Sequence, residues 1–192
     1  SGGSVNKHQI PNSPLQQPQF TAFGLALFDS ARLNENQIEH GVFNLAAVQK
    51  SFGDVDAQLA VHSRYARLHF VPDPVGDLMF NGVASDVRRA SLLNGMQGDV
   101  AWRIAPSHTL RTGFMANVEK TSVSNASLLF PLDAAGDPVD AAYPVVDRSA
   151  KVGWTLSGYV QDEWKIDDRL TLNAGLRFDR MKQYSTAGQL SP

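Results

Sequence analysis

Histidine is the residue type in this sequence best suited to bind a metal ion or to transfer protons near neutral pH. The chain has five histidines, His8, His40, His62, His69 and His108, and none of them forms an HExxH motif or an i, i+4 pair. An odd number of positions separates His62 from His69, so one strand would direct them to opposite faces. We therefore expect no metal site, and we expect His62 to belong to the polar face of a strand.

Carboxylates gather in two segments that also contain several prolines, with Asp73 and Asp77 in the first and Asp133, Asp137 and Asp140 in the second. Such oxygens could bind calcium, but neither segment has the spacing of an EF-hand loop, and we interpret them as solvated loop residues. The sequence has no GxSxG, P-loop or GxGxxG motif. These patterns predict that the chain is not an enzyme and has no catalytic residues, cofactor or metal.

The composition narrows the class of protein further. A length of 192 residues suits one domain or part of a larger one, and a net charge of -2 without a basic stripe gives no reason to expect a nucleic-acid partner. With no cysteine, disulfides and thiolate chemistry are excluded. No apolar run reaches the roughly 18 residues of a transmembrane helix, and the first twenty residues lack the apolar core of a signal peptide.

Residues 151–180 carry the clearest structural signal, because apolar and polar residues alternate strictly along two strand-length runs joined by a short turn. Alternation places the two sets on opposite faces of a strand. Asp167 and Asp168 in the turn suit tight-turn geometry. The apolar set of the first run is Val152, Trp154, Leu156, Gly158, Val160, Trp164 and Ile166, and that of the second is Leu170, Leu172, Ala174, Leu176 and Phe178.

Four further strands are predicted at about 37–50, 55–70, 91–104 and 109–121. The connections alternate between short turns, at 51–54, 105–108 and 166–169, and long segments, at 71–90 and 122–150. Strands of this length exceed the usual 5–6 or so residues of soluble sheets and match the roughly 9–11 needed to cross a bilayer. This rhythm is typical of transmembrane barrels, which have short periplasmic turns and long extracellular loops.

Three tryptophans support the membrane interpretation. Trp154 and Trp164 are ten positions apart on the apolar face, which is about 33 Å along a strand and about 25 Å after a 40° tilt, the height of an outer-membrane apolar band. Trp102 also lies just before a short turn, so we predict Trp102, Trp154 and Trp164 as membrane-girdle aromatics. The alternative is a soluble sheet with core tryptophans. Asp162 has the parity of the apolar face, which either an interfacial position or a local bulge would explain.

Two sequence segments resemble a known family. The words GYVQDEW at 158–164 and LTLNAGLRFD at 170–179, with the less distinctive HTLRTGF at 108–114, are similar to barrel hairpins of TonB-dependent outer-membrane receptors. The resemblance implies a barrel of about twenty-two strands plugged by an N-terminal globular domain, and energised uptake of a scarce solute such as a siderophore, vitamin, haem or glycan. It also implies the bacterial outer membrane as location, with outer-membrane lipid, the plug domain of the same full-length chain, TonB through an N-terminal region not seen here, and a small solute as partners.

The predicted fold class is therefore all-β: six antiparallel transmembrane strands in an up-and-down meander, forming part of a barrel. Residues 1–36 are predicted as an extracellular loop segment, 37–180 as the six-stranded part, and 181–192 as the start of the next loop or strand. Six strands are fewer than the roughly eight of the smallest closed barrels, so we expect the chain to be an excerpt of a longer receptor. Two alternatives stay open, an oligomeric outer-membrane adhesin or pore and a soluble β-barrel ligand binder.

Overall fold

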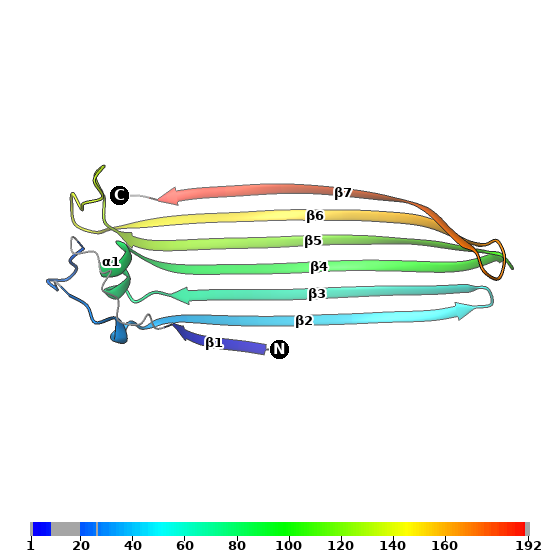
Figure 1. Ribbon diagram of the computed structural model, residues 1–192, viewed down its shortest axis with the longest axis horizontal. Helices are drawn as coiled ribbons and strands as arrows, with labels where there is room; N and C mark the ends of the chain where they lie inside the picture. The colour runs from blue at the N-terminus through cyan, green and yellow to red at the C-terminus, as the bar shows by residue number, and fades with distance from the viewer. Residues whose placement is uncertain (1, 9–19, 26, 191–192) are drawn as a thin grey trace.

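The computed structural model describes residues 2–8, 20–25 and 27–190. They form one seven-stranded sheet in which every strand pairs antiparallel with its sequence neighbours, in the order β1 to β7 (Figure 1). Two short helices, η1 (Ser30–Arg32) and α1 (Gly76–Asn81), lie in the connections. The strands are β1 (Gly2–His8), β2 (Glu35–Phe52), β3 (Val55–Val71), β4 (Val83–Ala105), β5 (His108–Leu129), β6 (Tyr143–Lys165) and β7 (Thr171–Leu190).

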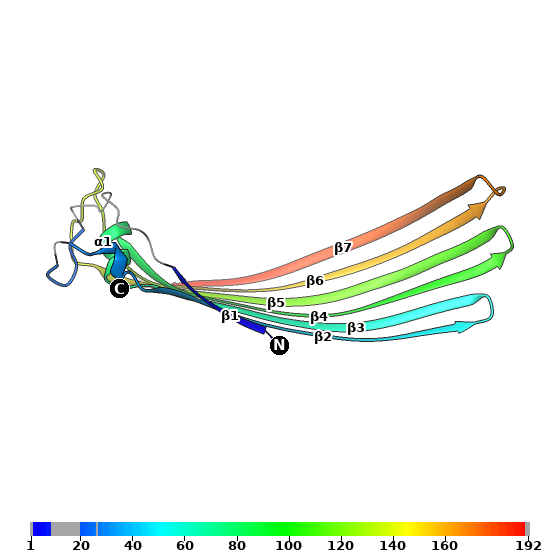
Figure 2. The ribbon, with the colours of Figure 1, turned by 60° about the horizontal axis from the view of Figure 1, so that its bottom comes forward.

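The predicted all-β meander is confirmed. The short turns 53–54, 106–107 and 166–170 gather at one end of the sheet, here called the turn end, and the long connections gather with α1 at the other, the loop end (Figure 1). The sheet twists and bends along its length (Figure 2) and, among the described residues, stays open with β1 and β7 as its edges. None of the helices in the described ranges is long and apolar enough to cross a membrane.

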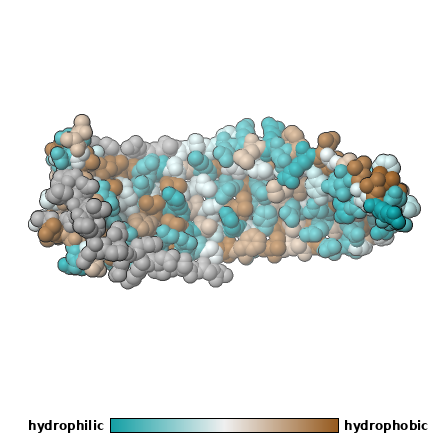
Figure 3. Space-filling model, viewed as in Figure 1, coloured by the Kyte–Doolittle hydropathy of each residue, from teal (hydrophilic) through white to brown (hydrophobic). Residues whose placement is uncertain are grey.

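The pairing register gives the sheet two chemically distinct faces, because directly paired residues point to the same side. On what we call the apolar face, one row of partners is Val48, Leu59, Gly98, Phe114, Gly158 and Phe178. On the polar face, a neighbouring row is Ala60, Gln97, Met115, Ser157 and Asp179. Large apolar side chains stay exposed, up to 80% for Leu176, and on the face seen in Figure 3 hydrophobic patches interrupt hydrophilic ones.

The structure extends the predicted strands toward the loop end. β4 begins at Val83 and not near residue 91, and β7 continues to Leu190 through the segment expected to start a new loop or strand. The segment 1–36 is also not wholly a loop, because β1 pairs with 35–41 of β2. Alternation marks a strand only where its two faces meet different surroundings, whereas these extensions are held by backbone pairing that leaves no such signature.

Among the described residues, the compact core lies at the loop end. Leu33, Leu78 and Met79 are at most 1% exposed there, and Phe20 stacks on Phe130 with ring centroids 5.7 Å apart. Phe28 meets Phe80 edge to face at 6.2 Å. Through these ring pairs Phe80 and Phe130 anchor the connections to one another.

Candidate functional site: two faces and a loop end

The polar face carries a cross-strand network of hydrogen bonds. The Tyr159 hydroxyl donates to Asp99 Oδ1 at 2.9 Å, which joins β6 to β4 across the whole of β5. Beside it, Arg111 Nη2 lies 3.1 Å from Glu163 Oε2. Further pairs on this face are Ser91 with Glu119, Gln161 with Asn173, and Arg177 with Asp179. Charged groups held in this way suit a surface that faces water or a polar partner domain and not an apolar core.

Glycines in the strand between explain how these side chains meet. Gly113 pairs with Asp99 on one side and Tyr159 on the other, and a Cβ on Gly113 would lie 2.5 Å from both Asp99 Oδ1 and Tyr159 Cε1. Only the missing Cβ leaves room for the phenol to cross β5. The same arrangement recurs where Gly95 separates His62 from Asn117.

These bridges were missed in the sequence, although glycine at a polar-face position of a central strand could have indicated them. His62 lies on the polar face, as its parity predicted. In the described part of the chain, no three His, Asp or Glu side chains are placed to hold a metal ion.

A groove of about 760 Å³ crosses β2 to β5 near the loop end. Small side chains form much of its lining, and the polar-face row Gly41, Ala66, Ser91 and Thr121 runs through it. Small residues in successive strands leave a depression because neighbouring side chains stand higher. Glu39 and Arg89, with opposite charges, also line this groove.

All three tryptophans lie on the apolar face by register. Trp164 stacks on His108 at a ring-centroid distance of 5.5 Å, and Trp154 has the Arg180 guanidinium 5.7 Å from its ring centre. Trp102 is 50% exposed. They fall at two levels, with Trp102 and Trp164 near the turn end and Trp154 toward the loop end.

The register also settles how Asp162 is accommodated. β5 and β6 pair without a shift around it, so no bulge turns Asp162 away from the apolar face. Instead its Oδ2 lies 2.8 Å from Nδ1 of His108, which is the direct partner of Trp164 in the register and lies at the turn end. The register thus excludes the bulge and leaves the interfacial position as the remaining explanation.

The loop carboxylates have structural roles. Asp73 accepts hydrogen bonds from the backbone N–H of Val75 and Gly76 at 3.1 and 2.9 Å, and from that of Asn34 at 3.1 Å, so it caps α1 and ties it to the segment before β2. Asp77 is only 5% exposed, and burial together with the Glu35 carboxyl raises its pKa to about 7. Asp133 receives backbone hydrogen bonds in its turn, chiefly from Asp137, which lower its pKa.

One comparison with known proteins identifies a match. A family model described as "TonB dependent receptor-like, beta-barrel" matches residues 9–192. A comparison with curated proteins finds no match for the chain.

Proposed function

The chain belongs to the family of TonB-dependent receptor-like β-barrels, an outer-membrane family of receptors and transporters and not of enzymes, and from this premise we propose that it is part of a receptor for energised uptake of a scarce solute. In this proposal the protein resides in the bacterial outer membrane. A plug domain of the full-length protein and TonB are its functional partners. The solute belongs to the classes that the sequence resemblance implies, a siderophore, vitamin, haem or glycan.

The observation that supports the proposal is the chemical difference between the two faces of the sheet. The apolar face exposes Leu176, Phe178 and Val160 at 80%, 66% and 43%, which would drive aggregation in water but suits contact with lipid. The opposite face carries the Tyr159–Asp99 and Arg111–Glu163 pairs, which suit a lumen occupied by water and a polar plug. In a bilayer the free edges of β1 and β7 require further strands, since unpaired backbone groups are costly there.

Solute recognition is proposed at the loop end, which would face outward, because short turns are periplasmic in such barrels. The connections within 1–36, 71–90 and 122–150 pack on one another there through the Phe20–Phe130 and Phe28–Phe80 contacts. The groove through Gly41, Ala66 and Ser91 opens on the polar face just below them and would contact the plug or the entering solute.

The proposal is tested by deleting the gene for the full-length protein and measuring uptake of radiolabelled ferric siderophores, cobalamin, haem iron and oligosaccharides. We expect the deletion strain to lose uptake of one of these solute classes and to regain it when the wild-type gene is restored. Inactivation of TonB should abolish that uptake again. Uptake that persists without TonB would refute energised transport. The two alternatives gain no support: the exposed apolar face disfavours a soluble binder, and no described feature favours an oligomeric adhesin or pore.

A further inference from the structure

Basic residues cluster on the apolar face just beyond its loop-end aromatic level. Tyr65 and Tyr184 fall in one cross-strand row there, and Trp154 lies in the row next to it. One row farther toward the loop end comes Arg67, and one row beyond that come Arg88 and Arg148. If the aromatic level marks the edge of the hydrocarbon, these arginines lie where lipid headgroups begin.

The three arginines surround a depression in the sheet. A groove of about 520 Å³ is lined by Arg67, Arg88 and Arg148, and the positions between them carry small side chains. Arg88 and Arg148 face each other across Ser124 of β5, about 10 Å apart at two strand spacings, while Arg67 is the diagonal neighbour of Arg88. The small residues of the groove on this face are Ala90, Ser122, Ser124, Ala150 and Thr186.

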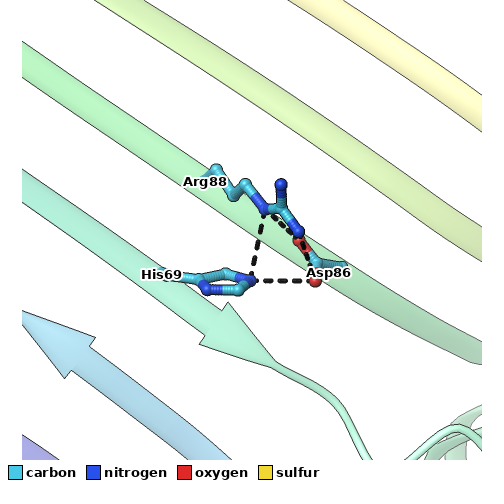
Figure 4. A network of polar contacts seen from close by, with 3 residues as sticks. All are labelled: His69, Asp86 and Arg88. Atoms are coloured by element: carbon cyan, nitrogen blue, oxygen red, sulfur yellow. Dashed lines mark hydrogen bonds and ion pairs between the residues drawn. The ribbon is translucent and has the colours of Figure 1, made fainter.

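Two of the three guanidinium groups have no counter-charge among the residues that the structure describes. Figure 4 shows Arg88 held by Asp86, with Nε to Oδ1 at 3.0 Å, and by His69, which itself lies 2.9 Å from the same carboxylate. Within the described residues, Arg67 and Arg148 have neither an ion pair nor a side-chain hydrogen bond, and both are exposed. Two acidic residues lie close by in the sheet, Asp147 next to Arg148 in β6 and Glu39 opposite Leu68, and both have the parity of the polar face. The groove is therefore a positively charged site.

We propose that this groove binds the phosphorylated headgroup of an outer-leaflet lipid, with Arg67 and Arg148 contacting phosphate oxygens and Arg88 held ready beside them. Guanidinium groups match phosphate oxygens with paired N–H donors, and small side chains between them leave space for the group. The site rests on contact between the apolar face and lipid, as proposed above, and does not depend on which solute is transported. Lipid is the occupant favoured here because the groove lies on the same face as the exposed apolar side chains and continues it toward the loop end.

The test uses the full-length protein purified in a neutral detergent. Its thermal unfolding is followed while diphosphorylated lipid A, enzymatically dephosphorylated lipid A or inorganic phosphate is added. We expect stabilisation by the diphosphorylated lipid alone, and we expect added NaCl to weaken it. An equal effect of the dephosphorylated lipid would overturn the phosphate contact, and an equal effect of inorganic phosphate at the same concentration would overturn the lipid assignment. Insensitivity to salt would also overturn the proposal.

Paired variants locate the site. Arg67→Gln with Arg148→Gln is expected to weaken lipid A binding about 30-fold, at about fivefold per removed charge near a membrane surface. Arg67→Lys with Arg148→Lys keeps the charges and should restore most of the affinity. The matched control, Arg64→Gln with Lys151→Gln, removes two exposed cations of β3 and β6 from the polar face, neither of which lines the groove, and should leave binding unchanged. Equal loss in the control, or full affinity in the first variant, would overturn the proposal. Solute uptake does not enter this assay, so it succeeds or fails independently of the transport proposal.

Discussion

The assignment of the apolar face to lipid can be tested with one arginine. Val160 lies on the apolar face of β6, four positions from Trp164 and six from Trp154. At about 3.3 Å per residue and a tilt of about 40°, it lies about 10 Å in depth from one tryptophan level and about 15 Å from the other. Val160→Arg therefore places a charge near the middle of the apolar band, where arginine costs about 2–4 kcal/mol.

The measurement is the free energy of unfolding of the full-length protein in phosphatidylcholine vesicles, from urea titrations read by heat-modifiable migration on gels. Val160→Ala corrects for the lost side chain, and Thr155→Arg adds the same charge to the polar face of the same strand, opposite Asn117. Ser157 would be a poor control, because it is 6% exposed and faces Asp179 directly. We expect Val160→Arg to lower the free energy of unfolding by about 2–4 kcal/mol and Thr155→Arg to lower it by less than about 1 kcal/mol. Equal losses would refute the assignment of the faces.

Three further predictions concern the polar face and the loop end. Gly113→Ala should break the phenol–carboxylate contact across β5 and cost about 1–3 kcal/mol, whereas Gly158→Ala, whose Cβ would meet only a carbonyl oxygen at 3.7 Å, should cost much less in the same urea assay. Asp73→Ala should speed hydrogen exchange of the α1 amides about 5- to 30-fold, because it removes the α1 cap and the link to Asn34, and unchanged exchange would contradict that role. The raised pKa of Asp77, about 7 against an ordinary 3.8, means that closing the loop cluster takes up a proton between these values. The stability of the loop cluster should fall by about 2 kcal/mol from pH 5.5 to 8 and level off above, while Asp77→Asn should show a flat profile of α1 hydrogen exchange corrected for intrinsic rates.

Alternation in the sequence identified the two faces of a strand wherever one of them carries exposed apolar side chains. The sets built on Trp154 and Leu172 agree with the register of β6 and β7 residue by residue. The same signal disappears in 83–90 and 181–190, where the strands continue. Beyond an apolar band both faces of a strand meet water, so side-chain types no longer report pairing, and backbone hydrogen bonds alone hold the ladder.

The contacts across the polar face depend on register and not on composition. Asp99 and Tyr159 are 60 positions apart, and nothing local in the sequence marks them as partners. They meet because the turns fix which residues pair, and because Gly113 lies between them. The buried state of Asp77 was likewise hidden, since it depends on the packing of Leu33 and Met79 from separate connections.

One irregularity follows from the face assignment itself. The turn 106–107 pairs Ala105 with His108, and continuing that register would set Trp102 opposite Arg111, forcing an apolar-face and a polar-face residue to the same side. A one-residue shift between Arg103 and Ala105 removes the conflict and pairs Trp102 with Leu110. Ile104 is thus the extra residue of a bulge that reconciles a tight turn with the parity of both strands.

Deletion of Ile104 should accordingly be tolerated. The residues before it keep their partners, Ala105 follows Arg103 directly, and the hairpin becomes regular with every side chain on its present face. We expect a loss below about 1 kcal/mol in the vesicle assay, small beside that of Val160→Arg. Insertion of one alanine after Leu110 should instead reverse the faces of β4 relative to β5 and prevent assembly. The deletion leaves a regular two-residue turn and moves no side chain to the other face. If it is as damaging as the insertion, the bulge is required by the turn itself and not for matching the faces of the two strands.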